Sequence, residues 1–153
     1  MDLILWRHAE AQDAEGDMID RNRPLTRRGD RQASRMSAWL DRQLPDGTRI
    51  LVSPAVRTEQ TARALSRKYR LHDELLPGAS ADQLLQLAGW PNARSPVLIV
   101  GHQPTLGETI ARVLGMADAE CSVKKGSIWW LRSRERDGQR QATVITVLTA
   151  EML

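Results

Sequence analysis

Short apolar runs alternate with longer segments of helical periodicity along the first part of the chain. Four consecutive apolar residues at positions 3–6 predict a buried strand. Residues 9–24 are polar and have no periodicity, so they predict a long loop. From Thr26 onward, small and apolar residues recur at helical spacing until a Pro-Asp-Gly sequence begins at position 45, and this pattern predicts a helix.

The middle of the chain predicts a second strand, a helix and an edge strand. Residues 49–52 form another buried apolar run. Ser53 followed by Pro54 is typical of an N-cap and the first helical position, and the periodicity predicts a helix that reaches about Tyr69. Residues 71–75 alternate between apolar and polar positions and predict an edge strand.

A second group of elements follows in the same order. Residues 81–89 predict a short helix, with Ser80 as its cap. Residues 96–100 predict a central strand, because the run is almost entirely β-branched or aliphatic. Pro104 begins another helix, and Gly115 marks its end.

The last part of the chain contains two β-type runs with no helix between them. Residues 127–131 and 142–148 predict strands, and residues 132–141 predict a polar linker that joins them. Strands that are joined directly pair antiparallel, whereas the earlier strands are separated by helices and are expected to be parallel. We therefore predict an α/β fold in a single domain over residues 1–153.

Length and composition exclude several classes of protein. A chain of 153 residues is long enough to bury one hydrophobic core without disulfides or a structural metal. With 41% hydrophobic and 27% charged residues, its composition is that of a folded protein, which excludes wholesale disorder. The single cysteine, Cys121, excludes an intrachain disulfide and a zinc site built from cysteines. No apolar run approaches a membrane span, and the first residues lack the features of a signal peptide. We expect a cytoplasmic enzyme or binding domain without a membrane partner.

The basic charge of the chain raises the alternative of a nucleic-acid-binding or phosphate-binding module. The net charge is +3, and arginine strongly outnumbers lysine. Acidic residues are interspersed among the arginines, however, and the neighbours Trp129 and Trp130 point to opposite faces of a strand. They therefore make no paired stacking platform, and we expect no nucleic-acid partner.

Polar residues follow three of the predicted parallel strands, and the two histidines and two arginines among them suit anion binding. These polar residues are Arg7, His8 and Glu10, then Ser53 and Arg57, then His102. The carboxyl ends of parallel strands meet at one edge of a sheet, so these segments are expected to converge. A cation in the first turn of a helix, as at Arg57, conflicts with the helix dipole, and a bound anion would remove that conflict. The pattern predicts an anion site.

Four motifs at these positions resemble a known family. They are Arg-His-Ala-Glu at 7–10, Arg-Pro-Leu-Thr at 23–26, Ser-Pro-Ala-Val-Arg-Thr-Glu-Gln-Thr-Ala at 53–62 and Gly-His-Gln-Pro at 101–104. They resemble the histidine phosphatase (phosphoglycerate mutase-like) superfamily, in particular its small SixA-type branch, over residues 3 to about 131. The resemblance implies a three-layer α/β/α fold with a mostly parallel sheet and an antiparallel C-terminal strand. Ala9 stands where glycine is usual, so the turn is expected to be tighter or differently angled.

The resemblance implies a role for each of the candidate residues. His8 would be the nucleophile and would form a covalent phosphohistidine. Arg7, Arg57 and His102 would surround the transferred phosphoryl group, and Arg23 would reach it from the loop. The guanidinium groups of two arginines, together with a histidine that donates a hydrogen bond, can balance the negative charge of the phosphoryl group. Neither a metal nor another cofactor is therefore expected.

The source of the proton for the leaving group is left open. Larger relatives use a carboxylate that follows the third strand, where Glu74 and Asp82 stand in this chain, and His102 is a further candidate. Short segments between the strands predict an open site, which suits a phosphate displayed on a protein. The expected substrate is phosphohistidine on a signalling protein such as a histidine-phosphotransfer domain, with inorganic phosphate as product. The alternative is a phosphomonoesterase that acts on a small-molecule phosphate or a phosphoprotein.

Overall fold

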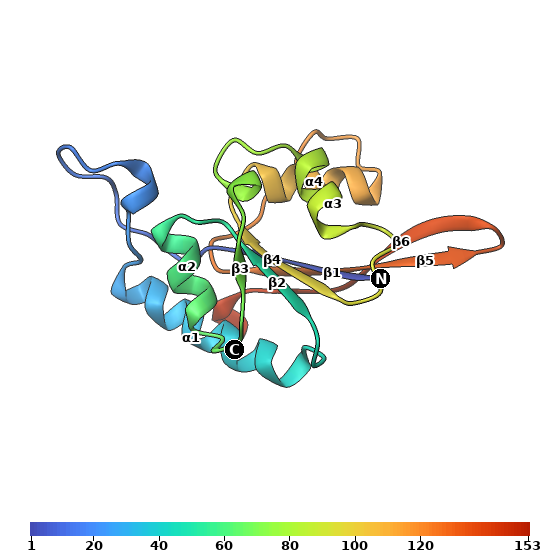
Figure 1. Cartoon of the computed structure of the whole chain (residues 1–153), viewed down its shortest axis with the longest axis horizontal. Helices are drawn as coiled ribbons and strands as arrows, with labels where there is room; N and C mark the ends of the chain where they lie inside the picture. Colours follow the sequence, from blue (N-terminus) through green and yellow to red (C-terminus); the bar gives the residue numbers. More distant parts are fainter.

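One six-stranded sheet organises the chain, and the computed structural model describes all of residues 1–153 (Figure 1). The strand order is β3-β2-β4-β1-β5-β6. The parallel strands are β1 (Asp2–Arg7), β2 (Arg49–Val52), β3 (Arg70–Leu71) and β4 (Val97–Gly101). The antiparallel strands are β5 (Ile128–Arg136) and β6 (Gln139–Leu148). All six strands therefore belong to one sheet.

Helices cover both faces of the sheet (Figure 1). Those on one face are α1 (Arg27–Gln43) and α2 (Val56–Arg63), and those on the other are α3 (Ala81–Ala88) and α4 (Thr105–Leu114). Single 3₁₀ turns lie at Asp20–Asn22, Asp73–Leu75 and Ala150–Met152. No helix combines the length and the apolar character that crossing a membrane would require. The predicted three-layer α/β/α fold is confirmed.

The central strands are apolar throughout because both of their faces are covered. In β1, Ile4 and Trp6 pack with α1 and α2, whereas Leu3 and Leu5 pack with α3 and α4. All four side chains are completely buried. This double burial explains why a continuous apolar run, rather than an alternating one, predicted the strand.

Helix α2 is shorter than predicted and begins later. Its N-cap is Ala55 instead of Ser53, and the helix ends at Arg63 instead of reaching about Tyr69. The chain turns at Ser66, which has a left-handed φ of 54°. The hydroxyl of Ser53 makes no helix cap, because it is bonded to a side chain of another strand end.

The prediction of an edge strand over residues 71–75 is wrong for most of its length. Only Arg70–Leu71 pairs with β2, and Asp73–Leu75 forms a 3₁₀ turn. Within that turn Leu75 is buried against the α3–α4 side of the sheet. One inward apolar position was enough to imitate the alternation of a strand.

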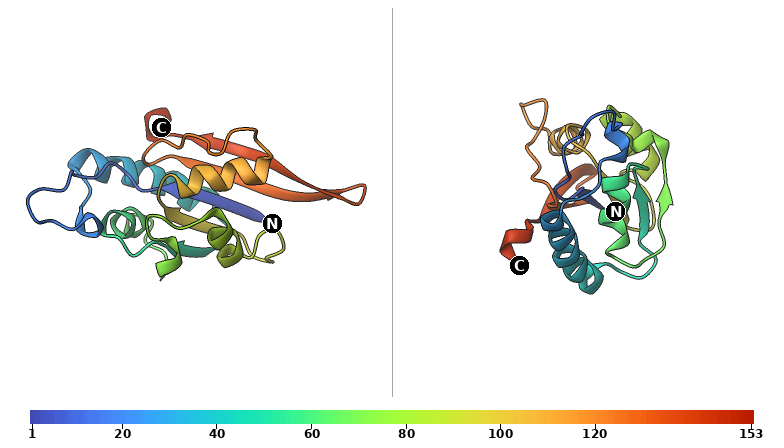
Figure 2. Two further views of the ribbon diagram at one scale, coloured as in Figure 1. Left: turned by 90° about the horizontal axis from the view of Figure 1, so that it is seen from above. Right: turned by 90° about the vertical axis from the view of Figure 1, so that its left-hand side faces the viewer.

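The predicted linker over residues 132–141 is also wrong, because it forms the outer half of a hairpin. Strand β5 continues to Arg136 and β6 begins at Gln139, so only Asp137 and Gly138 lie between them. Both have positive φ, 53° and 75°, as a two-residue hairpin turn requires. This half projects from the body (Figure 2) and is solvated, so its polar sequence showed no buried face.

Helix α1 begins directly against the segment that follows β1, and Gly29 permits this close approach. The Thr26 hydroxyl accepts from the Gly29 N–H at 2.9 Å and bonds to the Glu10 carboxylate at 2.9 Å. A side chain at position 29 would overlap the backbone carbonyl of Glu10. We therefore expect Gly29→Ala to lower the free energy of unfolding by about 1–3 kcal/mol, measured by urea denaturation. Ser34→Ala, on the exposed side of α1, is the control and should leave stability nearly unchanged; equal stability of the two variants would contradict the close approach.

Candidate active site

Two histidines meet at the carboxyl edge of the sheet, as predicted from their positions after β1 and β4. These strands are parallel neighbours with Arg7 opposite Gly101, so His8 and His102 follow side by side. Their ring centroids are 5.4 Å apart, and the rings are tilted by 55°. The residues are 6% and 3% exposed. The site therefore contains two imidazoles that are almost shielded from water.

The His8 ring is oriented by its own backbone. Its Nδ1 lies 2.7 Å from the Ala9 carbonyl oxygen, which can only accept, so Nδ1 carries a proton. Burial lowers the pKa of His8 to about 3, against the smaller opposing effect of the Ala9 bond, and the charges of Arg57, Arg7 and Arg23 lower it further. The ring is therefore neutral at pH 7, and its Nε2 holds a free electron pair.

The His102 ring has one bonded and one unbonded nitrogen. Its Nε2 lies 2.8 Å from the Ser53 hydroxyl, whereas its buried Nδ1 has no hydrogen-bond partner. Burial lowers the pKa of His102 to about 3, and the charge of Arg57 is the next largest cause. This ring is also neutral at pH 7.

Arg7 at the end of β1 and Arg57 in the first turn of α2 each make hydrogen bonds to the protein through terminal nitrogens and leave Nε unbonded. Arg7 donates from Nη1 to the Val123 carbonyl at 2.7 Å. Arg57 donates from Nη1 to the Asp20 carbonyl at 2.9 Å and from Nη2 to the Asp20 carboxylate at 3.1 Å. Both Nε atoms are buried without a partner. Together with His102 Nδ1, they are buried polar atoms that a bound oxyanion would satisfy.

Arg23 lies at the base of the loop between β1 and α1. It donates from Nε to the Asp20 carboxylate at 2.9 Å and from Nη1 to the Gln12 carbonyl at 2.8 Å. Asp20 thus bridges Arg23 and Arg57. The structure brings Arg23 to the same cluster through this shared carboxylate.

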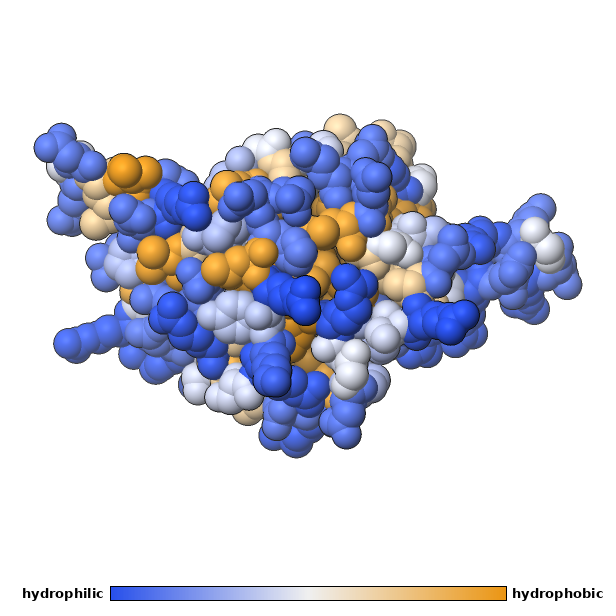
Figure 3. Space-filling model, in the orientation of Figure 1, coloured by the Kyte–Doolittle hydropathy of each residue, from blue (hydrophilic) through white to orange (hydrophobic).

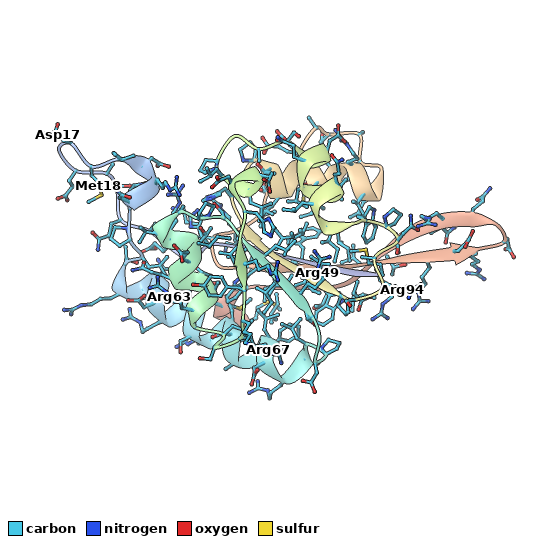
Figure 4. All side chains as sticks on the ribbon, in the orientation of Figure 1. Asp17, Met18, Arg49, Arg63, Arg67 and Arg94 are labelled. Atoms are coloured by element: carbon cyan, nitrogen blue, oxygen red, sulfur yellow. The ribbon has the colours of Figure 1, made fainter.

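The loop itself projects from the body beyond these contacts (Figure 4, where Asp17 and Met18 are labelled). Met18 and Ile19 are exposed, and an apolar patch is visible on the loop in the space-filling view (Figure 3). The base of the loop therefore contacts Arg57, while its outer part faces solvent.

Helix α2 contacts the segment that follows β1 through Thr61, a residue of the third motif. The Thr61 hydroxyl accepts from the Ala9 N–H at 3.1 Å and donates to the Arg57 carbonyl at 2.7 Å. Ala9 is fully buried, and it is not among the residues with positive φ. Alanine fits this turn because the backbone at residue 9 does not enter the left-handed region.

The residues that meet here are rich in nitrogen donors, which suit an anion. No group of three or more histidine, cysteine or carboxylate side chains is arranged to hold a metal ion. A groove of about 810 Å³ lies away from these residues, beside β2 and β3, and is lined by residues such as Arg49, Arg67 and Tyr69. Arg49 and Arg67 are labelled in Figure 4. None of the predicted site residues lines that groove.

Comparison with known proteins gives the family. A family model described as "Histidine phosphatase superfamily (branch 1)" matches residues 3–78. The phosphohistidine phosphatase SixA of Escherichia coli is 31% identical over 124 residues, which cover 74% of each chain. The SixA homolog of Haemophilus influenzae is 30% identical over 131 residues, 75% of this chain and 78% of that one. The chain belongs to the histidine phosphatase superfamily.

A solved structure agrees with this assignment. The protein histidine phosphatase SixA complexed with tungstate superimposes with a TM-score of 0.77 at 25% identity, over 99% of each chain. The SixA-type branch, the phosphoglycerate mutase-like fold and the phosphatase class predicted from the sequence are confirmed.

In this histidine phosphatase, neither carboxylate that was considered as a general acid contacts the site residues. Glu74 lies 3.4 Å from His72 Nδ1, and Asp82 is paired with Arg112; both carboxylates are exposed. Glu10, which follows His8, is bonded to Thr26 and Arg28 at the start of α1. None of these three carboxyl groups is therefore placed beside the two histidines.

Sequence analysis missed Asp20 and the contact of Ser53. Hydrogen bonding to Arg23, followed by the charge and hydrogen bond of Arg57, holds the pKa of Asp20 below its usual range, against the opposing effect of burial. Its position three residues before Arg23 is compatible with an ion pair but does not indicate Arg57 as a second partner. Ser53 was predicted both as a helix cap and among the residues at the strand ends, but nothing in the sequence indicated His102 as its partner.

Proposed function

We propose that this protein hydrolyses phosphohistidine on a signalling protein through a covalent phosphohistidine on His8. The observation that carries the proposal is a neutral imidazole beside three buried nitrogens that lack partners, Arg7 Nε, Arg57 Nε and His102 Nδ1. The names of its SixA relatives and the tungstate bound to one of them support the same chemistry. Tungstate is an oxyanion, like the phosphoryl group that is transferred.

In the first step, the free electron pair of His8 Nε2 attacks phosphorus, and the bond from phosphorus to the substrate nitrogen breaks. The proton on His8 Nδ1 stays bonded to the Ala9 carbonyl, which keeps the attacking nitrogen unprotonated. Arg7, Arg57 and His102 donate to the phosphoryl oxygens, and Arg23, which Asp20 holds near the site, contributes a weaker field. The electron pair of the broken bond stays on the substrate histidine, which takes up a proton from solvent water as it leaves.

In the second step, water attacks the phosphorus of phosphorylated His8. A phosphorus–oxygen bond forms, the phosphorus–nitrogen bond breaks, and His8 and inorganic phosphate are released. The same donors hold the phosphoryl group in both steps, because the group stays at one place while its partners exchange.

The placement of the carboxyl groups favours phosphohistidine over phosphate esters. Glu10, Glu74 and Asp82 are bonded or paired away from the histidines, and the pKa of Asp20 is lowered by Arg23 and Arg57, which makes Asp20 a poor proton donor. An alkoxide leaving group needs a proton from the enzyme, and such general acid catalysis contributes about 10²- to 10⁴-fold. Imidazole leaves readily once its nitrogen is protonated, so it depends less on an enzyme acid. A phosphotransfer domain or another protein that carries phosphohistidine is therefore the proposed partner.

A comparison of leaving groups tests this assignment. We expect kcat/KM for a phosphohistidine protein to exceed that for a phosphoserine peptide by about 100-fold or more. Glu74→Gln and Asp82→Asn should leave both values unchanged, because neither carboxylate contacts the site. If either variant loses ester cleavage while phosphohistidine cleavage is spared, the phosphomonoesterase alternative gains the support that this proposal loses.

A further inference from the structure

Ser53 lies at the end of β2 with its hydroxyl against His102. The Ser53 oxygen is 2.8 Å from His102 Nε2, and Ser53 is 0% exposed. This is the only hydrogen bond of the hydroxyl. The hydroxyl does not cap α2, whose N-cap is Ala55. Its position therefore calls for an explanation other than helix formation.

Two arrangements of hydrogens are compatible with the contact. If His102 Nε2–H donates to the hydroxyl oxygen, the buried hydroxyl hydrogen has no acceptor, and Nδ1 is a bare acceptor that repels an anion. If the hydroxyl donates to Nε2, the hydroxyl hydrogen is satisfied and the ring hydrogen lies on Nδ1. The second arrangement leaves only Nδ1–H without a partner, and this nitrogen is buried at the site.

We propose that Ser53 is a positioning residue that fixes His102 in the neutral tautomer with its hydrogen on Nδ1, ready to donate to the transferred phosphoryl group. For a neutral ring, the tautomer follows from the hydrogens and acceptors of Ser53 and His102, whatever the substrate. Its use in catalysis rests on the proposed function. In this tautomer His102 stabilises charge as a hydrogen-bond donor and is not the acid that protonates the leaving group.

The tautomer can be measured without any substrate. In a long-range ¹H–¹⁵N correlation spectrum of the labelled protein at pH 7, His102 should show a protonated Nδ1 and an unprotonated Nε2. In Ser53→Ala the donor to Nε2 is lost, and a population with the hydrogen on Nε2 should appear. A wild-type spectrum with protonated Nε2 would overturn the proposal.

Turnover of the phosphohistidine protein tests the catalytic part. We expect Ser53→Ala to lower kcat/KM by about 10- to 100-fold, and Ser53→Cys, whose thiol is a weak donor of similar size, to lie between Ala and wild type. Ser37→Ala removes a hydroxyl that is equally buried, within α1, and should retain full kcat/KM.

The outcomes separate this inference from the proposed function. If Ser53→Ala loses activity only in proportion to folded protein, with an unchanged His102 tautomer, Ser53 has a structural role and the inference is wrong. If the wild-type protein does not hydrolyse phosphohistidine, the proposed function fails, while the spectrum still determines the tautomer.

Discussion

His8→Ala abolishes turnover of phosphohistidine and abolishes covalent labelling of the protein. The variant lacks the atom that forms the bond to phosphorus, so the loss is expected to be about 10⁴-fold or more in kcat. The wild type, treated with a radiolabelled phosphoryl donor, should carry acid-labile, base-stable label on His8. Both effects follow from the His8 ring, which burial keeps neutral and which the Ala9 bond orients with Nε2 unprotonated.

His72→Ala is the matched control, because His72 is the only histidine outside the pair and lies 3.4 Å from Glu74, away from the site. It should retain label and turnover. Turnover that persists in His8→Ala would contradict the covalent route, even if other residues of the site proved essential.

Arg57→Ala has the second largest expected effect, a decrease in kcat/KM of about 10²- to 10³-fold. The variant removes an Nε donor that is buried without a partner. It also leaves Asp20 without one of its two cationic partners beside the phosphoryl position, which adds repulsion. Inhibition by inorganic phosphate should weaken along with turnover, because phosphate uses the same donor.

Arg57→Lys tests whether charge or geometry matters. Lysine keeps the charge but has no second donor fixed in the same plane, so we expect it to recover only a small part of the loss. Arg63→Ala, on the exposed side of the same helix, is the control and should behave as wild type. A phosphate inhibition constant unchanged in Arg57→Ala would contradict the role proposed for this residue.

Strands were predicted correctly from the sequence where one strong local pattern determines the element. Residues 3–6, 49–52 and 96–100 are strands because apolar residues cover both faces of a central sheet, and the structure confirms each of them. The hairpin beyond residue 131 was missed because a solvated ribbon has no buried face to produce a pattern. Its one strong signal was the Asp-Gly pair at the turn.

In the candidate site, too, some features were predictable from local sequence and others were not. The positions of His8 and His102 after parallel strands predicted that they would meet, and the structure places their ring centroids 5.4 Å apart. The roles assigned to Arg7, His8, Arg23, Arg57 and His102 stay predictions, which the variants above test. The Asp20 bridge was not predictable, because one of its partners lies 37 residues away on another element.

The sequence by itself determined the order of elements, the family and the residues that follow each central strand, because these depend on local patterns and motifs. Only the tertiary structure decided which nitrogens are bonded and which remain free. Those states depend on contacts between side chains from different strands, such as that of Ser53 with His102, and on the burial that lowers the pKa of both histidines. Burial and partners of this kind arise only when the sheet brings its strand ends together.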